Sequence, residues 1–148
     1  MLENIFTQWE YKYRRCNERV YTVLSGHCGD YTQVFSWNRS ARILHCYCDM
    51  SAKFDKRKIK AVTDLVFMMN SRLWLGRFDL LLKERAVVFS ISNIIQEELA
   101  CSEVIERMVD TTVVECDRFL PAFNMLIGTK ISPRQVFDSC IMDVEGEA

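Results

Sequence analysis

The chain has 148 residues, a net charge of −1 and 49 % hydrophobic residues. This length fits one domain, residues 1–148, that can bury a core without a metal or a disulfide staple. The near-neutral charge excludes a strong overall attraction to nucleic acid or to an anionic membrane.

The first half of the chain reads as a series of short strands after one or two turns of helix at residues 2–6. Trp9, Tyr11 and Tyr13 alternate with charged residues, which is the period of a half-buried strand. Consecutive short strands separated by turns predict an antiparallel meander. The strands are expected at residues 9–14, 19–24, 31–37 and 43–50.

The middle of the chain is predicted to form a helix and then two more strands. Asp55 is a candidate N-cap, and Gly76 occupies the place of a left-handed residue that ends a helix. The strands are expected at residues 78–82 and 87–91, joined by a link without glycine. The helix predicted after Asp55 has an apolar stripe whose residues are three or four positions apart. These residues are Ile59, Val62, Val66, Met69 and Leu73.

The last third of the chain is predicted to be helical. Ser102 begins a long amphipathic segment, and Pro121 inside it is expected to bend the helix or to begin a new turn. A capping box at 132–135 begins a last helix, which is expected to end at about Met142. Residues 142–148 are predicted to form a loose, acidic tail.

Three segments carry a resemblance to a known family. They are Asn70-x-Arg72-Leu73-Trp74-Leu75-Gly76-Arg77-Phe78-Asp79, Val87-Val88-Phe89, and Glu115-Cys116-Asp117-Arg118-Phe119-x-Pro121-Ala122-Phe123. With them, nearly the whole chain resembles the YbjN family of bacterial sensory transduction regulators. The helix at Ser132-Pro133 and the ending Gly146-Glu147-Ala148 are similar to its alphaproteobacterial branch.

The resemblance implies a fold like that of type III secretion chaperones. That fold is α+β, with an antiparallel sheet of about six strands and with helices packed mainly on one face. The resemblance also implies regulation or protein binding rather than catalysis, a possible homodimer, and neither catalytic residues nor a cofactor.

The cysteines and histidines raise a zinc hypothesis, which needs four converging ligands. Cys46 and Cys48 share one strand face with Leu44 and Met50, which indicates core positions, so no metal site is predicted. The odd number of seven cysteines, the lack of a leader sequence and the lack of a membrane-spanning apolar run predict a cytoplasmic protein. The candidate zinc ligands are His27, Cys28, His45, Cys46 and Cys48.

The remaining chemically active side chains form no recognisable catalytic group. Asp110, Glu115 and Asp117 are spread around one helix and are interpreted as solvated. Cys28 and Cys101 fall in predicted loops and are the candidate reactive thiols, although no neighbouring residue indicates a lowered pKa.

Trp74 and Phe78 lie on either side of Gly76. They are either a ledge that binds a partner or two aromatic anchors of the core, and we favour the core because aromatic residues so often anchor it.

A cluster of cations lies at the start of the helix predicted after Asp55. Such a cluster is either a solvated face or a contact for a phosphate, an acidic lipid or an acidic protein. No motif of a nucleic-acid reader accompanies it. The cluster comprises Lys53, Lys56, Arg57, Lys58 and Lys60.

The third strand places Tyr31, Gln33, Phe35 and Trp37 on one face. Because helices are expected on only one side of the sheet, this aromatic face is predicted to be open. It is either a solvent-tolerant surface or an interface, and we favour an interface with a second copy or another protein. A protein-binding regulatory domain is therefore the first hypothesis. The alternatives are an enzyme or ligand-binding domain with an unrecognised site, and a nucleic-acid or membrane-surface binder that uses the cations at 53–60.

Overall fold

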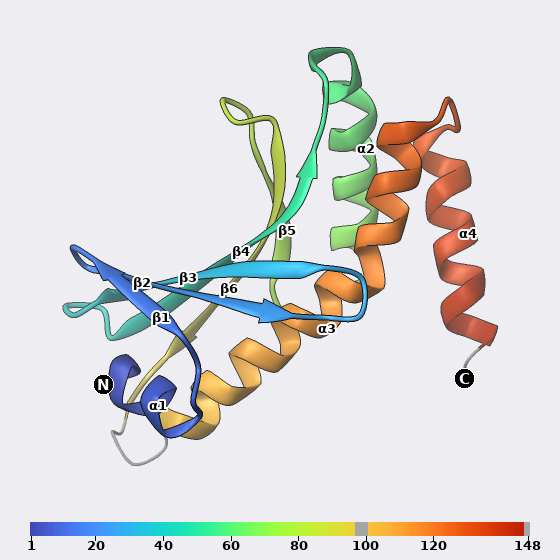
Figure 1. The fold of residues 1–148 in the computed structure, drawn as a ribbon. Coiled ribbons are helices and arrows are strands. Elements are labelled where there is room, and N and C mark those ends of the chain that lie inside the picture. Colours follow the sequence, from blue (N-terminus) through green and yellow to red (C-terminus); the bar gives the residue numbers. More distant parts are fainter. Residues whose placement is uncertain (97–100, 147–148) are drawn as a thin grey trace.

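The computed structural model describes residues 1–96 and 101–146, with side chains up to residue 141. Figure 1 shows a strongly bent sheet with a long helix running diagonally along one of its faces. The helices are α1 (Leu2–Gln8), the short η1 (Lys56–Lys58), α2 (Ile59–Asn70), α3 (Cys101–Gly128) and α4 (Pro133–Gly146). The strands are β1 (Tyr13–Cys16), β2 (Arg19–Ser25), β3 (Asp30–Asn38), β4 (Ile43–Lys53), β5 (Arg77–Leu81) and β6 (Ala86–Ile94).

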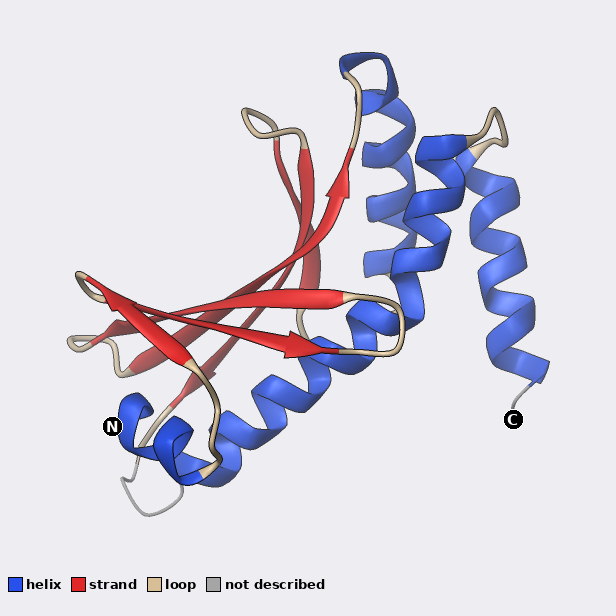
Figure 2. Ribbon diagram, viewed as in Figure 1, coloured by secondary structure: helices blue, strands red, loops and turns tan. Residues whose placement is uncertain are grey.

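The six strands form one antiparallel sheet in the order β1-β2-β3-β4-β6-β5. The first four are the predicted meander, and the β5–β6 hairpin adds to the free edge of β4. Figure 2 shows α1 and the first half of α3 beneath the sheet, while α2 and α4 flank the second half of α3. The chain therefore has the predicted α+β architecture.

The core lies between α3 and the sheet face that α3 covers. Alternate residues of β3 and β4 point into it, because side chains of a strand point to opposite faces in turn. Phe78, Phe119 and Phe123 meet edge to face with ring centroids 5.2–5.4 Å apart. Cys46, Cys48 and Cys116 are buried in the same core as small apolar side chains.

The long strand β4 bends near its end. Its register against β6 shifts between Asp49 and Ala52, and Ser51 takes a left-handed φ of 59°. An extra residue of this kind increases the local twist of a strand. The bend carries the end of β4 and the β5–β6 hairpin away from β1–β3 (Figure 1).

Several predicted boundaries are wrong. Residues 9–12 precede β1, and Trp9 and Tyr11 instead pack around Phe6 of α1, where their ring centroids lie 6.2 and 6.0 Å from it. Pro121 lies inside α3, which continues through it to Gly128, and Figure 1 shows this helix changing direction between its first and second halves, which agrees with the predicted bend. The last helix continues to Gly146 instead of ending near Met142, so most of the predicted tail is helical, and its final two residues lie outside the described part.

Candidate functional site

The predicted aromatic interface on β3 lies on the covered side of the sheet. Tyr31, Gln33 and Phe35 are completely buried against α3 and its neighbours, and Trp37 packs at the margin of the same core. The expectation of an open aromatic face is therefore wrong. The sequence indicates which residues of β3 share a face, but burial by α3 decides which face stays open.

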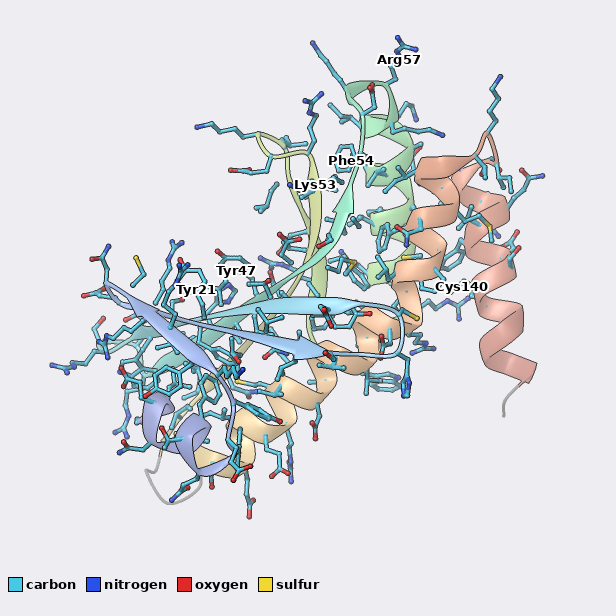
Figure 3. The ribbon with its side chains drawn as sticks, viewed as in Figure 1. Tyr21, Tyr47, Lys53, Phe54, Arg57 and Cys140 are labelled. Atoms are coloured by element: carbon cyan, nitrogen blue, oxygen red, sulfur yellow. The ribbon has the colours of Figure 1, made fainter. Side chains whose placement is uncertain are left out.

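The open face carries polar, charged and small apolar side chains. Arg14 lies over the ring of Tyr21 at 5.4 Å from its centroid, and Nδ1 of His45 lies 2.8 Å from Oγ of Ser92. Tyr21 and Tyr47 project from this side of the sheet in Figure 3. Burial raises the pKa of Tyr47, despite the opposing influence of the neighbouring Arg19.

A partly buried polar anchor joins the β2–β3 loop to α3. Asp117 accepts hydrogen bonds from the Tyr31 hydroxyl at 2.6 Å and from the backbone N–H groups of His27 and Cys28 at 2.9 and 2.8 Å. Burial opposes the charge of Asp117, but these hydrogen bonds outweigh it and hold its pKa below the ordinary value. The prediction that Asp117 is solvated is wrong, because it holds the loop in place.

A cleft of about 820 Å³ lies beside this anchor, between the loop, α3 and α4. Its walls are mostly apolar, and its polar residues include His27, Arg118 and Ser139. Both carboxylate oxygens of Asp117, which also lines the cleft, already accept hydrogen bonds from the loop or from Tyr31. Two thiol residues, Cys28 and Cys140, also line the cleft.

The predicted zinc ligands do not converge. Cys46 and Cys48 lie in the core, His45 lies on the open face, and His27 and Cys28 belong to the β2–β3 loop. Among the residues whose side chains the structure describes, 1–96 and 101–141, no group of three His, Cys, Asp or Glu is arranged to hold a metal ion. The other candidate thiol, Cys101, is buried at the start of α3 rather than in a loop.

The segment between α2 and β5 is tied across its two ends by the side chain of Asn70. The side-chain amide of Asn70 clamps the backbone of Phe78: Phe78 N–H donates to Oδ1 at 2.7 Å, and Nδ2 donates to the Phe78 carbonyl at 2.9 Å. Gly76 takes a left-handed φ of 72° at the entry to β5, and a side chain there would collide with Phe89. The predicted helix cap is wrong in detail, because α2 already ends at Asn70.

The two aromatic residues on either side of Gly76 have opposite environments. Phe78 is buried in the core, as expected, whereas Trp74 is 100 % exposed and is no core anchor. Leu75 beside it is 60 % exposed. We call Trp74 and Leu75 the Trp74 corner. The sequence signal is an aromatic residue two positions before a turn glycine, a pattern that predicts a core anchor and here marks an exposed one.

The cations at 53–60 have different environments. The Lys58 ammonium donates to the carbonyls of Leu126 and Thr129 at the end of α3, at 2.9 and 2.5 Å. Lys60 forms an i,i+4 ion pair with Asp64 at 3.0 Å. These two lysines therefore have structural roles. Lys53, Lys56 and Arg57 remain exposed at the end of β4 and in η1.

These features define a small α+β domain whose distinctive parts are exposed surfaces and one open cleft. The chain belongs to the YbjN family, because the family model described as "Putative bacterial sensory transduction regulator" matches residues 1–125. The matched part includes Asn70, Trp74 and Asp117 and ends within α3, so α4 lies beyond it. No curated protein and no solved structure matches the chain. No helix in the described part of the chain is long and apolar enough to cross a membrane.

Proposed function

We propose that this protein is a non-enzymatic regulatory domain that binds a protein partner at the Trp74 corner. The observation that carries the proposal is the full exposure of Trp74, next to the exposed Leu75. Trp is the residue most enriched at the energetic centres of protein interfaces. Clustered exposed apolar side chains also mark interaction sites. The description of the family as a regulator supports the same role.

The geometry of the corner supports binding because it is already ordered. The Asn70 clamp fixes the end of α2 to the start of β5 on one side of Trp74. The guanidinium of Arg72 lies 6.0 Å from the ring centroid of Phe137, which connects the corner to α4. A surface that does not reorganise loses less conformational entropy when a partner docks.

The test uses Trp74→Ser and a matched control on the open face, Val23→Ser, since Val23 is also largely exposed. Tagged wild-type and variant proteins are expressed in the native bacterium, and the co-purifying proteins are quantified by mass spectrometry. A partner should be recovered with wild type and Val23→Ser and lost with Trp74→Ser. With that partner purified, loss of the Trp side chain should weaken binding by about 2–4 kcal/mol, or about 30- to 1,000-fold.

If Trp74→Ser still recovers a partner and Val23→Ser does not, that partner binds the open face and the proposal is wrong.

The partner in this proposal can be a second copy of the chain, as in the homodimer expected from the chaperone-like resemblance. In that case light scattering should show a dimer for wild type and a monomer for Trp74→Ser.

We place the protein in the cytoplasm, where its seven cysteines would remain as thiols.

The cleft between α3 and α4 supports a second candidate, the binding of a small ligand. Its size and its mostly apolar walls with a few polar groups are typical of ligand pockets. A small-molecule thermal-shift screen tests this candidate. Compounds that raise the melting temperature of the wild type should no longer do so with Ala122→Trp, which fills the cleft from α3. They should still do so with Trp74→Ser.

A further inference from the structure

The fold brings two basic segments together at one end of the sheet. Lys53 at the end of β4 pairs with Ala86 at the start of β6, and the Phe54 N–H donates to the Arg85 carbonyl at 2.9 Å. The turn after β4 and the β5–β6 hairpin therefore project side by side, as Figure 1 shows. Figure 3 labels Lys53, Phe54 and Arg57 in this region.

Five cations at this end lack an ion pair within the described part of the chain. We call them the basic end: Lys53, Lys56, Arg57, Lys83 and Arg85. Two carboxylates lie among them, Asp55 and Glu84. The Asp55 carboxylate already accepts a hydrogen bond from the Arg57 backbone N–H at 2.9 Å. The basic end therefore has a local excess of positive charge, although the chain as a whole has a net charge of −1.

The hairpin also exposes leucine among these cations. Leu82 is 61 % exposed at the turn and Leu81 is 38 % exposed just before it. The turn between β5 and β6 contains no glycine, and Arg85 takes the left-handed φ of 51° that closes it. Exposed leucines on a projecting turn, surrounded by cations, combine the two attractions that bring a peripheral protein to an anionic bilayer.

We propose that the basic end binds the surface of an anionic lipid bilayer. The cations contact headgroup phosphates, and Leu82 enters the boundary between headgroups and acyl chains. A nucleic acid offers phosphates but no apolar layer for the leucine, and two projecting turns suit a flat surface better than a concave one. The proposal goes beyond the proposed function and uses a different surface, so its test is independent of Trp74.

The experiment is flotation of the full chain with vesicles of phosphatidylcholine, with and without phosphatidylglycerol. Wild type should float only with the anionic vesicles. It should bind well at about 0.05 M salt and weakly at about 0.5 M salt, because screening shortens the reach of each charge. Lys83→Gln with Arg85→Gln should reduce partitioning about 25-fold, at about fivefold for each cation removed. Leu82→Asp should reduce it as well.

Matched controls lie away from the basic end. Ile94 has the same exposure as Leu82, 61 %, and lies at the far end of β6, so Ile94→Asp should bind like wild type. Arg107→Gln removes an exposed cation of α3 and should also have no effect. Circular dichroism melts confirm that each variant is folded before its binding is compared.

Four results would overturn the proposal. They are the absence of binding to anionic vesicles, equal binding to neutral vesicles, unchanged binding of the Lys83/Arg85 double variant, and equal losses in the control variants. Unchanged binding of Leu82→Asp would overturn the insertion of the leucine. Salt-sensitive retention on heparin without vesicle binding would assign the basic end to nucleic acid and contradict a lipid role.

Discussion

The hydroxyl of Tyr31 donates a hydrogen bond of 2.6 Å to Oδ1 of Asp117, and this bond joins β3 to the middle of α3. The two N–H groups of the β2–β3 loop complete the coordination of the same carboxylate. Asp117→Ala should therefore destabilise the protein by about 2–3 kcal/mol, because three donors lose a charged acceptor. Urea unfolding measures the change. The matched control Asp110→Ala removes an exposed carboxylate of the same helix and should change stability by less than about 0.5 kcal/mol.

The Asp117 anchor also predicts a dependence on acid. Because the pKa of Asp117 is lower in the folded protein than its ordinary value of 3.8, the unfolded chain takes up a proton first. The stabilisation is complete above about pH 4 and is lost as the pH falls through the folded pKa. The stability difference between wild type and Asp117→Asn should shrink over that range in urea titrations. A constant difference from neutral pH to below pH 3 would contradict this assignment.

Glu115 should behave in the opposite way. Burial raises the pKa of Glu115 above the ordinary value of 4.5, and the charge of Arg118 offsets only part of that rise. One carboxylate oxygen of Glu115 is also buried without a hydrogen bond. The charged form is therefore unfavourable in the folded state, and stability contributed by the protonated form is lost as the pH rises through the folded pKa. Glu115→Gln should stabilise the protein at neutral pH by at most about 1 kcal/mol. Below about pH 4 the two proteins should be equally stable.

Gly26 is required by the same anchor. A Cβ atom there would come within 2.5 Å of Asp117 Oδ1 and of the Tyr31 ring. Gly26→Ala should cost about 1–3 kcal/mol in thermal or urea unfolding, because both partners must shift. Gly128 at the end of α3 has no atom within 4 Å of such a Cβ, so Gly128→Ala should be neutral or should stabilise by up to about 1 kcal/mol. Equal effects of the two substitutions would contradict the close packing at Gly26.

The thiols should separate into two classes. Cys16 and Cys28 are exposed, whereas Cys46, Cys48 and Cys116 are buried. Burial raises the pKa of Cys46, and the neighbouring Cys116 thiol together with burial raises that of Cys48. Maleimide labelling mapped by mass spectrometry should modify the first two within minutes and the other three only after unfolding. Rapid labelling of Cys46 in the native protein would contradict the core that α3 covers.

The strand order of the meander and the helix after Asp55 could be predicted from local periodicity and caps. The open face could not, because alternation groups Tyr31 with Phe35 but does not show which side α3 will cover. The exposure of Trp74 could not be predicted for a related reason. Its environment depends on how the chain passes from α2 to β5, and at that point no other element covers it.

The basic end shows a third limit. Lys53 and Arg85 are far apart in the sequence, and they meet only because the β5–β6 hairpin pairs with the edge of β4. Local patterns do not fix that pairing. The Asn70 clamp is a similar case, because its partner is a backbone group of the following strand, and spacing alone does not reveal it.

The central claim is that a protein partner contacts Trp74. The most direct measurement is photo-crosslinking in the native bacterium, with p-benzoylphenylalanine introduced at position 74 and, in separate strains, at positions 23 and 94. The account predicts a discrete crosslinked adduct at position 74 that is absent at the other two positions. Adducts of equal yield at all three positions, or an adduct at position 23 alone, would contradict it.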